Sequence, residues 1–170
     1  PSPRFGFTVV RENTEGLYSH DLSMAGPDSN GLWDVVKQDP TVTHSTRADT
    51  AVALRVTTGF GWRRLLRTAA LPEQHPQRSL AELLRTAAAL TGRAADPALR
   101  RVTVADKPNI LRESGAIIRD AVDEVAAEFP DVDFEIANAD AVTMRLITSP
   151  MSFDVIAAEN LLGDILSDLG

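Results

Sequence analysis

The fold class is decided by residues 153–169, which read FDVIAAENLLGDILSDL. The apolar run over 153–158 predicts a buried strand, and the apolar spacing over 161–169 predicts a helix. Earlier segments repeat this alternation without a hairpin signal between strands; the expected strands are 101–105 and 134–137, and the expected helices are 113–128 and 139–147. We therefore predict an α/β fold with a mixed, largely parallel sheet and flanking helices.

The first half of the chain is less regular. Strands are expected over 5–10, 33–37 and 51–57, with an irregular, exposed segment over 19–32. A helix is expected from Gly59, with Thr58 as its N-cap, and a second helix over 79–90. In the helix over 113–128, one stripe is expected to face the core; its members are Ile117, Ile118, Val122 and Val125.

The composition excludes several classes of protein. The net charge of −7 argues against binding nucleic acid through a basic surface. The 44% of hydrophobic and 24% of charged residues are typical of a globular domain. The chain has no cysteine, which excludes disulfides and thiolate metal sites, and no stretch approaches the roughly 18 apolar residues of a membrane span. We expect a cytoplasmic protein that binds neither nucleic acid nor membrane.

Two acidic residues in the last predicted helix are the sharpest functional signal. Asp164 and Asp168 lie four residues apart, so both carboxylates lie on one helix face. Such carboxylates repel each other unless a cation lies between them, and hard oxygen ligands suit Mg²⁺ or Mn²⁺. A solvated acidic face is the alternative interpretation.

Other polar residues follow predicted strands, and each has a plain structural alternative. Lys107 can act as an acid or base, or be a turn lysine in water. Arg11 suits bidentate recognition of a carboxylate. Tyr18, the only tyrosine, can donate a proton or cover the core, and Asp140 lies where a helix start favours an acid. The histidines lie in loop-like segments and are interpreted as surface residues; they are His20, His44 and His75.

Four blocks of sequence carry a resemblance to one family: VRENTEGLY at 10–18, DKPNIL at 106–111, DAVTMRLITSP at 140–150, and the stretch over 153–169. In this order they resemble the metal-dependent β-decarboxylating dehydrogenases, the isocitrate/isopropylmalate dehydrogenase family. The resemblance implies an isopropylmalate dehydrogenase-like fold. Four substrates are compatible with it: isocitrate, isopropylmalate, homoisocitrate and tartrate.

The resemblance also implies a role for each matching residue. Arg11 looks like the arginine that grips the substrate carboxylate, and Asn109 like a second substrate contact. Tyr18 and Lys107 match the catalytic acid/base pair. The metal-binding carboxylates are matched by Asp140, Asp164 and Asp168. In the family the site is shared by the two chains of a homodimer: Lys107 and Asp140 match residues of one chain, and its partner supplies the residues matched by Arg11, Tyr18, Asp164 and Asp168.

The implied reaction is oxidative decarboxylation of a 2-hydroxy acid with Mg²⁺ or Mn²⁺ and with NAD or NADP as cofactor. The resemblance implies that residues 1–150 form the small dimerisation domain, which binds substrate and metal. Residues 151–170 would form one strand and helix leading back into an absent large, cofactor-binding domain. We therefore expect that the chain alone does not reduce NAD⁺ or NADP⁺. Segments 19–50 and 71–90 look longer than usual for the family. The alternative function is a stand-alone, non-catalytic homodimerising domain that binds metal or a dicarboxylate.

Overall fold

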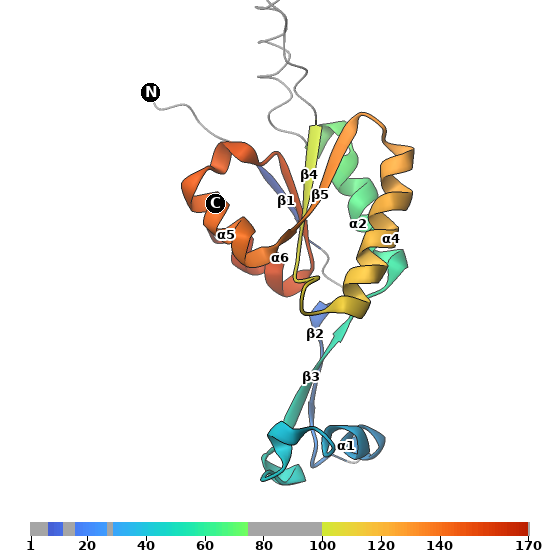
Figure 1. Ribbon diagram of the computed structural model, residues 1–170, viewed down its shortest axis with the longest axis vertical. Helices are drawn as coiled ribbons and strands as arrows, with labels where there is room; N and C mark the ends of the chain where they lie inside the picture. The colour runs from blue at the N-terminus through green and yellow to red at the C-terminus, as the bar shows by residue number, and fades with distance from the viewer. Residues whose placement is uncertain (1–6, 12–15, 27–28, 75–99, 170) are drawn as a thin grey trace, which may run out of the picture.

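A four-stranded parallel sheet forms the body of the molecule (Figure 1). The computed structural model describes residues 7–11, 16–26, 29–74 and 100–169. The strand order is β1-β6-β4-β5, all neighbours being parallel; the strands are β1 (Thr8–Arg11), β6 (Val155–Ala158), β4 (Arg100–Asp106) and β5 (Val132–Asn138). Because β6 pairs with both β1 and β4, the last strand of the chain is an interior strand of the sheet. The predicted α/β class and largely parallel sheet are confirmed.

Helices cover both faces of this sheet (Figure 1). The elements α2 (Gly59–Ala70) and α4 (Arg112–Glu128) pack on one face, against alternate residues such as Val102 and Val104 of β4. The elements α5 (Ala139–Thr148) and α6 (Asn160–Ser167) pack on the other, against residues such as Ile156 of β6. Because successive side chains of a strand point to opposite faces, each strand contributes residues to two separate hydrophobic cores, one on each face of the sheet.

The two helices of the first face form as the spacing of their apolar residues predicts. The Thr58 side chain accepts a hydrogen bond from the backbone N–H of Gly61 at 3.0 Å, which caps α2. In α4, the buried stripe includes Ile118, Val122 and Val125. Ile117 is the exception to the predicted stripe, because its neighbour Ile118 occupies the core face and leaves Ile117 38% exposed.

A two-stranded antiparallel arm leaves the body and carries α1 (Asn30–Val36) at its far end (Figure 1). The arm consists of β2 (Gly16–Ser23) and β3 (Ala51–Val56), with a register irregularity between Gly16 and His20. Two predictions are wrong here. Residues 19–23, expected to be irregular, belong to β2, and the strand expected over 33–37 is replaced by the helix α1 and the turn after it.

The far end of the arm has a small core of its own. Met24 is fully buried, and the Ser29 hydroxyl donates a hydrogen bond to its carbonyl oxygen at 2.8 Å. Arg47, in a short 3₁₀ helix (Arg47–Asp49), donates to the same carbonyl through Nε at 2.8 Å. These contacts fold the connection between the two arm strands into an ordered cap.

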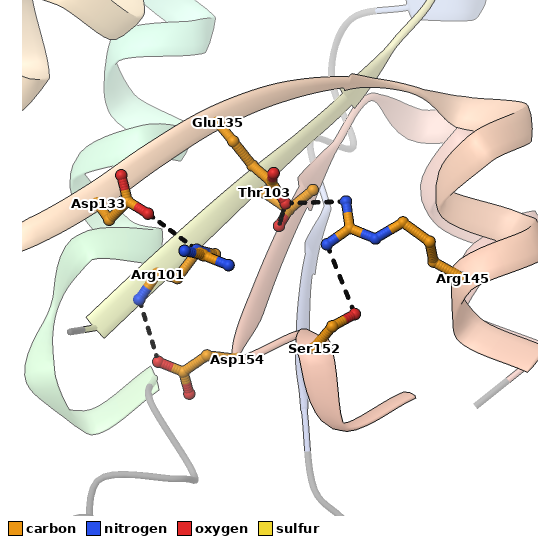
Figure 2. A network of polar contacts seen from close by, with 7 residues as sticks. All are labelled: Arg101, Thr103, Asp133, Glu135, Arg145, Ser152 and Asp154. Atoms are coloured by element: carbon orange, nitrogen blue, oxygen red, sulfur yellow. Dashed lines mark hydrogen bonds and ion pairs between the residues drawn. The ribbon is translucent and has the colours of Figure 1, made fainter. Parts of the chain in front are cut away.

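A polar network lies on the sheet face that carries α5, near the amino ends of the strands (Figure 2). The buried Thr103 hydroxyl lies 2.7 Å from Oε1 of Glu135, to which Arg145 donates at 3.1 Å. The guanidinium of Arg145 also stacks over the Phe153 ring, 4.6 Å from its centroid. Because its charged groups are paired with each other, we interpret this network as support for the fold.

The remaining predictions concern the helix expected over 79–90, the histidines and a membrane span. The helix expected over 79–90 and His75 lie outside the described residues, as does the side chain of His20. His44 is exposed, as predicted. Short 3₁₀ helices complete the described part of the chain: Pro40–Val42, Pro72–Gln74 and Pro150–Ser152. None of the described helices is long and apolar enough to span a membrane.

Candidate active site

The carboxyl edge of the parallel sheet gathers the predicted site residues. Arg11 is the last residue of β1, and Lys107 directly follows β4. Asp140 lies in the first turn of α5, directly after β5, and Asp164 lies in α6, which follows β6. Ligands of open α/β sheets bind at the carboxyl ends of the strands, so this edge is the candidate site.

Arg11 is held by α6. Its Nε donates to Oδ1 of Asn160 at 3.0 Å, and its Nη2 donates to the same oxygen. Its Nη1 forms an ion pair with Oδ1 of Asp164, the two side chains being 32% and 42% exposed. Gly163 makes this course possible, because a Cβ there would lie 2.7 Å from Cγ of Arg11. The guanidinium therefore lies along α6 at the sheet edge.

Lys107 and Asp140 form a second ion pair at the same edge. Lys107 Nζ donates to Oδ2 of Asp140 at 2.6 Å, with side-chain exposures of 34% and 70%. This hydrogen bond holds the pKa of Asp140 below its ordinary value of 3.8, outweighing the opposing effect of desolvation. The first turn of a helix favours a carboxylate as well. Lys107 and Asp140 thus neutralise each other at a solvent-accessible position.

Three further candidate residues lie near this edge by sequence position. Asp168 ends α6, is exposed, and donates its backbone N–H to the Asp164 carbonyl at 3.2 Å, so the two aspartates lie one turn apart. Asn109 is exposed in the turn between β4 and α4. Tyr18 lies in β2, and its side chain is outside the described part of the structure.

The carboxylates expected to bind metal are not all brought together within one chain. Across the described ranges, no group of three or more His, Asp or Glu residues is placed to hold an ion. The donor chemistry nevertheless fits Mg²⁺ or Mn²⁺, because Asp140, Asp164 and Asp168 offer only hard carboxylate oxygens. The ion pair of Asp164 uses one of its two oxygens.

Sequence reasoning assigned no role to several residues that contact or precede the candidates. Asn160, which holds Arg11, is the second residue after the buried strand β6; the polar step Glu159–Asn160 after a buried strand was the available signal. A buried cluster centred on Arg55 was also missed. In this cluster Arg55 bonds Asp106, the last residue of β4, and Glu159, the residue after β6.

A family model described as isocitrate/isopropylmalate dehydrogenase matches residues 3–170. The chain belongs to this family. DlpA of Legionella pneumophila is 37% identical over 176 residues, covering 99% of this chain and 24% of DlpA. The 3-isopropylmalate dehydrogenase of Rhodococcus opacus is 34% identical over 167 residues, covering 98% of this chain and 38% of that enzyme.

Solved structures agree with the assignment to the isocitrate/isopropylmalate dehydrogenase family. Isocitrate dehydrogenase from Methylococcus capsulatus matches 95% of this chain with a TM-score of 0.61 and 29% identity, over 36% of its own length. The TT0538 protein from Thermus thermophilus matches 99% of the chain with a TM-score of 0.64 and 26% identity, over 26% of its length. The resemblance of fold expected from the sequence is confirmed. The chain spans 24% and 38% of the two curated relatives named above.

Proposed function

We propose that this chain provides the substrate- and metal-binding part of an NAD(P)-dependent enzyme that oxidatively decarboxylates a 2-hydroxy dicarboxylic or tricarboxylic acid. One observation carries the proposal. Charged side chains at the end of β1 and after the other three parallel strands form two ion pairs at the carboxyl edge of the sheet, Arg11 with Asp164 and Lys107 with Asp140. An edge with two cations and two carboxylates suits an anionic substrate together with a divalent cation.

Arg11 is the proposed substrate anchor. A guanidinium presents parallel N–H donors that match a carboxylate, which a lysine cannot reproduce. The hydrogen bonds to Asn160 fix the orientation of the Arg11 guanidinium, so the incoming carboxylate would replace the carboxylate of Asp164 as its partner. This exchange would leave Asp164 available as a ligand at the moment when substrate binds.

Lys107 and Tyr18 are the proposed proton-transfer groups. Lys107 Nζ would take the proton of the substrate 2-hydroxyl, which requires its ion pair with Asp140 to open so that the amine is neutral. The Tyr18 hydroxyl would later deliver a proton to the carbon that has lost CO₂. Asn109, exposed in the turn after Lys107, is the proposed second substrate contact.

The proposed metal ligands are Asp140, Asp164 and Asp168. These residues would hold Mg²⁺ or Mn²⁺, which would supply Lewis-acid stabilisation of negative charge on the substrate, and NAD⁺ or NADP⁺ would supply the hydride acceptor. Asp164 and Asp168 lie about one helical turn apart, so both carboxylates are on the same side of α6. We assign residues 1–150 to the substrate- and metal-binding domain, and residues 151–170 to the return into a cofactor-binding domain.

A homodimer is part of the proposal, because the three carboxylates do not meet within one chain. Large apolar side chains remain exposed on the helices next to the site and would suit burial by a second copy; they are Met144 at 60%, Ile147 at 71% and Ile165 at 48% exposure. We expect the chain to sediment as a dimer at tens of micromolar. Sedimentation as a monomer at that concentration would contradict the shared site.

Manganese binding tests the metal assignment. We expect D164N/D168N to weaken Mn²⁺ binding, measured by electron paramagnetic resonance, by at least about tenfold, because even outer-shell partners of a metal site contribute about 10–100-fold. The matched control is D120N/E124Q, which removes two exposed acids four residues apart on α4. Equal Mn²⁺ affinity in the wild type and D164N/D168N would refute the assignment. Dehydrogenase activity is measured on the product of the complete reading frame, with Mn²⁺ and each of the four candidate substrates.

A further inference from the structure

Arg55 is a buried cation between two buried carboxylates. Its Nη2 lies 2.6 Å from Oδ1 of Asp106, and its Nε lies 2.8 Å from Oε2 of Glu159. The side chains are 11%, 0% and 8% exposed, respectively. The third nitrogen, Nη1, donates to the Ser114 hydroxyl at 3.3 Å. All three nitrogens of this guanidinium are therefore used to join the arm strand β3 to β4, β6 and α4.

The charges of this cluster make the arginine necessary. Burial alone would lower the pKa of Arg55, but the hydrogen bonds with Glu159 and Asp106 outweigh it and raise the pKa, so the guanidinium stays charged. One positive charge faces two negative ones. Removal of the arginine would leave two carboxylates buried without a cation, which is among the costliest changes in a protein interior.

The cluster lies one residue away from both halves of the candidate site. Asp106 directly precedes Lys107, and Glu159 directly precedes Asn160, which holds Arg11. The other arm strand reaches the same point. Gly16, at the start of β2, has a φ of 105°, and a Cβ there would lie 2.8 Å from Oε2 of Glu159. Both arm strands therefore meet the body at Glu159, which precedes Asn160, and β3 also reaches Asp106, which precedes Lys107.

We propose that Arg55 is a positioning residue, which fixes the carboxyl ends of β4 and β6 relative to each other and thereby aligns Lys107 with the Arg11–Asn160 pair. The inference rests on the proposed function for the meaning of this alignment. Arg55 itself does not touch the reacting groups in this scheme. It acts through the backbone of Asp106 and Glu159.

The chain contains only two lysines, Lys37 and Lys107, which makes the test direct. Each amine is engaged by an aspartate, Lys37 by Asp34 at 2.7 Å and Lys107 by Asp140 at 2.6 Å. The two amines are acylated at one pH, and the extent of acylation of each is quantified by peptide mass spectrometry. The ratio of the acylation of Lys107 to that of Lys37, called the Lys107-to-Lys37 ratio, reports the environment of Lys107. Lys37, in the turn after α1, is the internal reference.

The test variant is Arg55→Gln, and the matched control is Arg100→Gln. Arg100 lies at the opposite end of β4, is 16% exposed, pairs with Asp131 and donates to the Ala70 carbonyl at 3.3 Å. We expect R55Q to raise the Lys107-to-Lys37 ratio by about three- to tenfold, the factor that corresponds to one net hydrogen bond, and R100Q to leave it unchanged. We also expect amide hydrogen exchange to accelerate over 106–109 and 159–161 in R55Q only.

An unchanged ratio in R55Q, or an equal rise in R100Q, would overturn the positioning role. Arg55→Lys, which keeps one positive charge, provides a second variant, and its new amine is separated by peptide mass. We expect an intermediate ratio for R55K; if R55K fails to fold while Arg100→Lys folds, Arg55 only holds the fold and the inference is wrong. Failure of the proposed function would show instead as absent Mn²⁺ binding by the wild type, with the labelling ratios unaffected.

Discussion

Substitution of Gly163 by alanine tests the course of Arg11 along α6. In a helix interior, alanine is favoured over glycine by about 1 kcal/mol. At this position, however, the added Cβ would lie 2.7, 2.9 and 3.0 Å from Cγ, Cδ and Cβ of Arg11. The arginine must therefore move, and its bonds to Asn160 and Asp164 are lost. These half-exposed contacts contribute about 0.5–1 kcal/mol each, and the displacement costs about 1–3 kcal/mol more.

We therefore expect G163A to lower the free energy of unfolding by about 1–4 kcal/mol after the gain in helix propensity is subtracted, so the net change is opposite in sign to the effect of helix propensity. Urea denaturation followed by circular dichroism measures the change. Gly31→Ala in α1 is the control, because nothing lies within 4 Å of its Cβ position, and we expect it to be neutral or stabilising. If G163A stabilises the chain as much as G31A does, Arg11 does not pass over Gly163 and the anchor geometry is wrong.

Three further predictions concern the body of the fold. Leu66 is fully buried between the sheet and α4, so we expect Leu66→Ala to lower the free energy of unfolding by about 2–5 kcal/mol in urea denaturation. Thr58→Ala removes the N-cap of α2 and should lower the free energy of unfolding by about 1 kcal/mol, whereas Thr68→Ala, at an exposed position of the same helix, should cause no loss. Equal effects of the two substitutions would show that Thr58 does not cap the helix. The hydrogen bond from Arg67 lowers the pKa of Glu128 below its ordinary 4.5, so the pair stabilises the fold above pH 4.5 and this stabilisation is lost as the pH falls through the lowered pKa. In denaturation curves at decreasing pH, the difference in unfolding free energy between the wild type and Glu128→Gln should therefore shrink.

Much of the body could be predicted because its signals are local. The buried strand β6 is a continuous apolar run, β4 is rich in β-branched residues, and α2 and α4 have apolar residues at helical spacing. The order of site residues followed from their positions after strands, because parallel strands end at one edge. For this reason Arg11, Lys107, Asp140 and Asp164 were expected at the edge where they lie.

Only part of the arm could be predicted: the strand expected over 51–57 is β3, whereas β2 and α1 were not expected. The sequence of β2, GLYSHDLS, shows no period-two apolar pattern that would indicate a strand. Trp33, Val35 and Val36 form an apolar run too short to distinguish a helix from a strand. Arg55 depends on partners 51 and 104 positions away, and such pairings have no local signature.

The site shared between two chains is tested most directly by mixed dimers. The variant Asp140→Asn and the double variant D164N/D168N are each expected to lose Mn²⁺ binding. In a dimer of one chain of each kind, one site would combine the intact Asp140 of one chain with the intact Asp164 and Asp168 of its partner. We therefore predict that co-expressed, affinity-selected mixed dimers bind one Mn²⁺ per dimer with wild-type affinity, and the wild type binds two. Mixed dimers that bind no more Mn²⁺ than either variant alone would contradict the shared site.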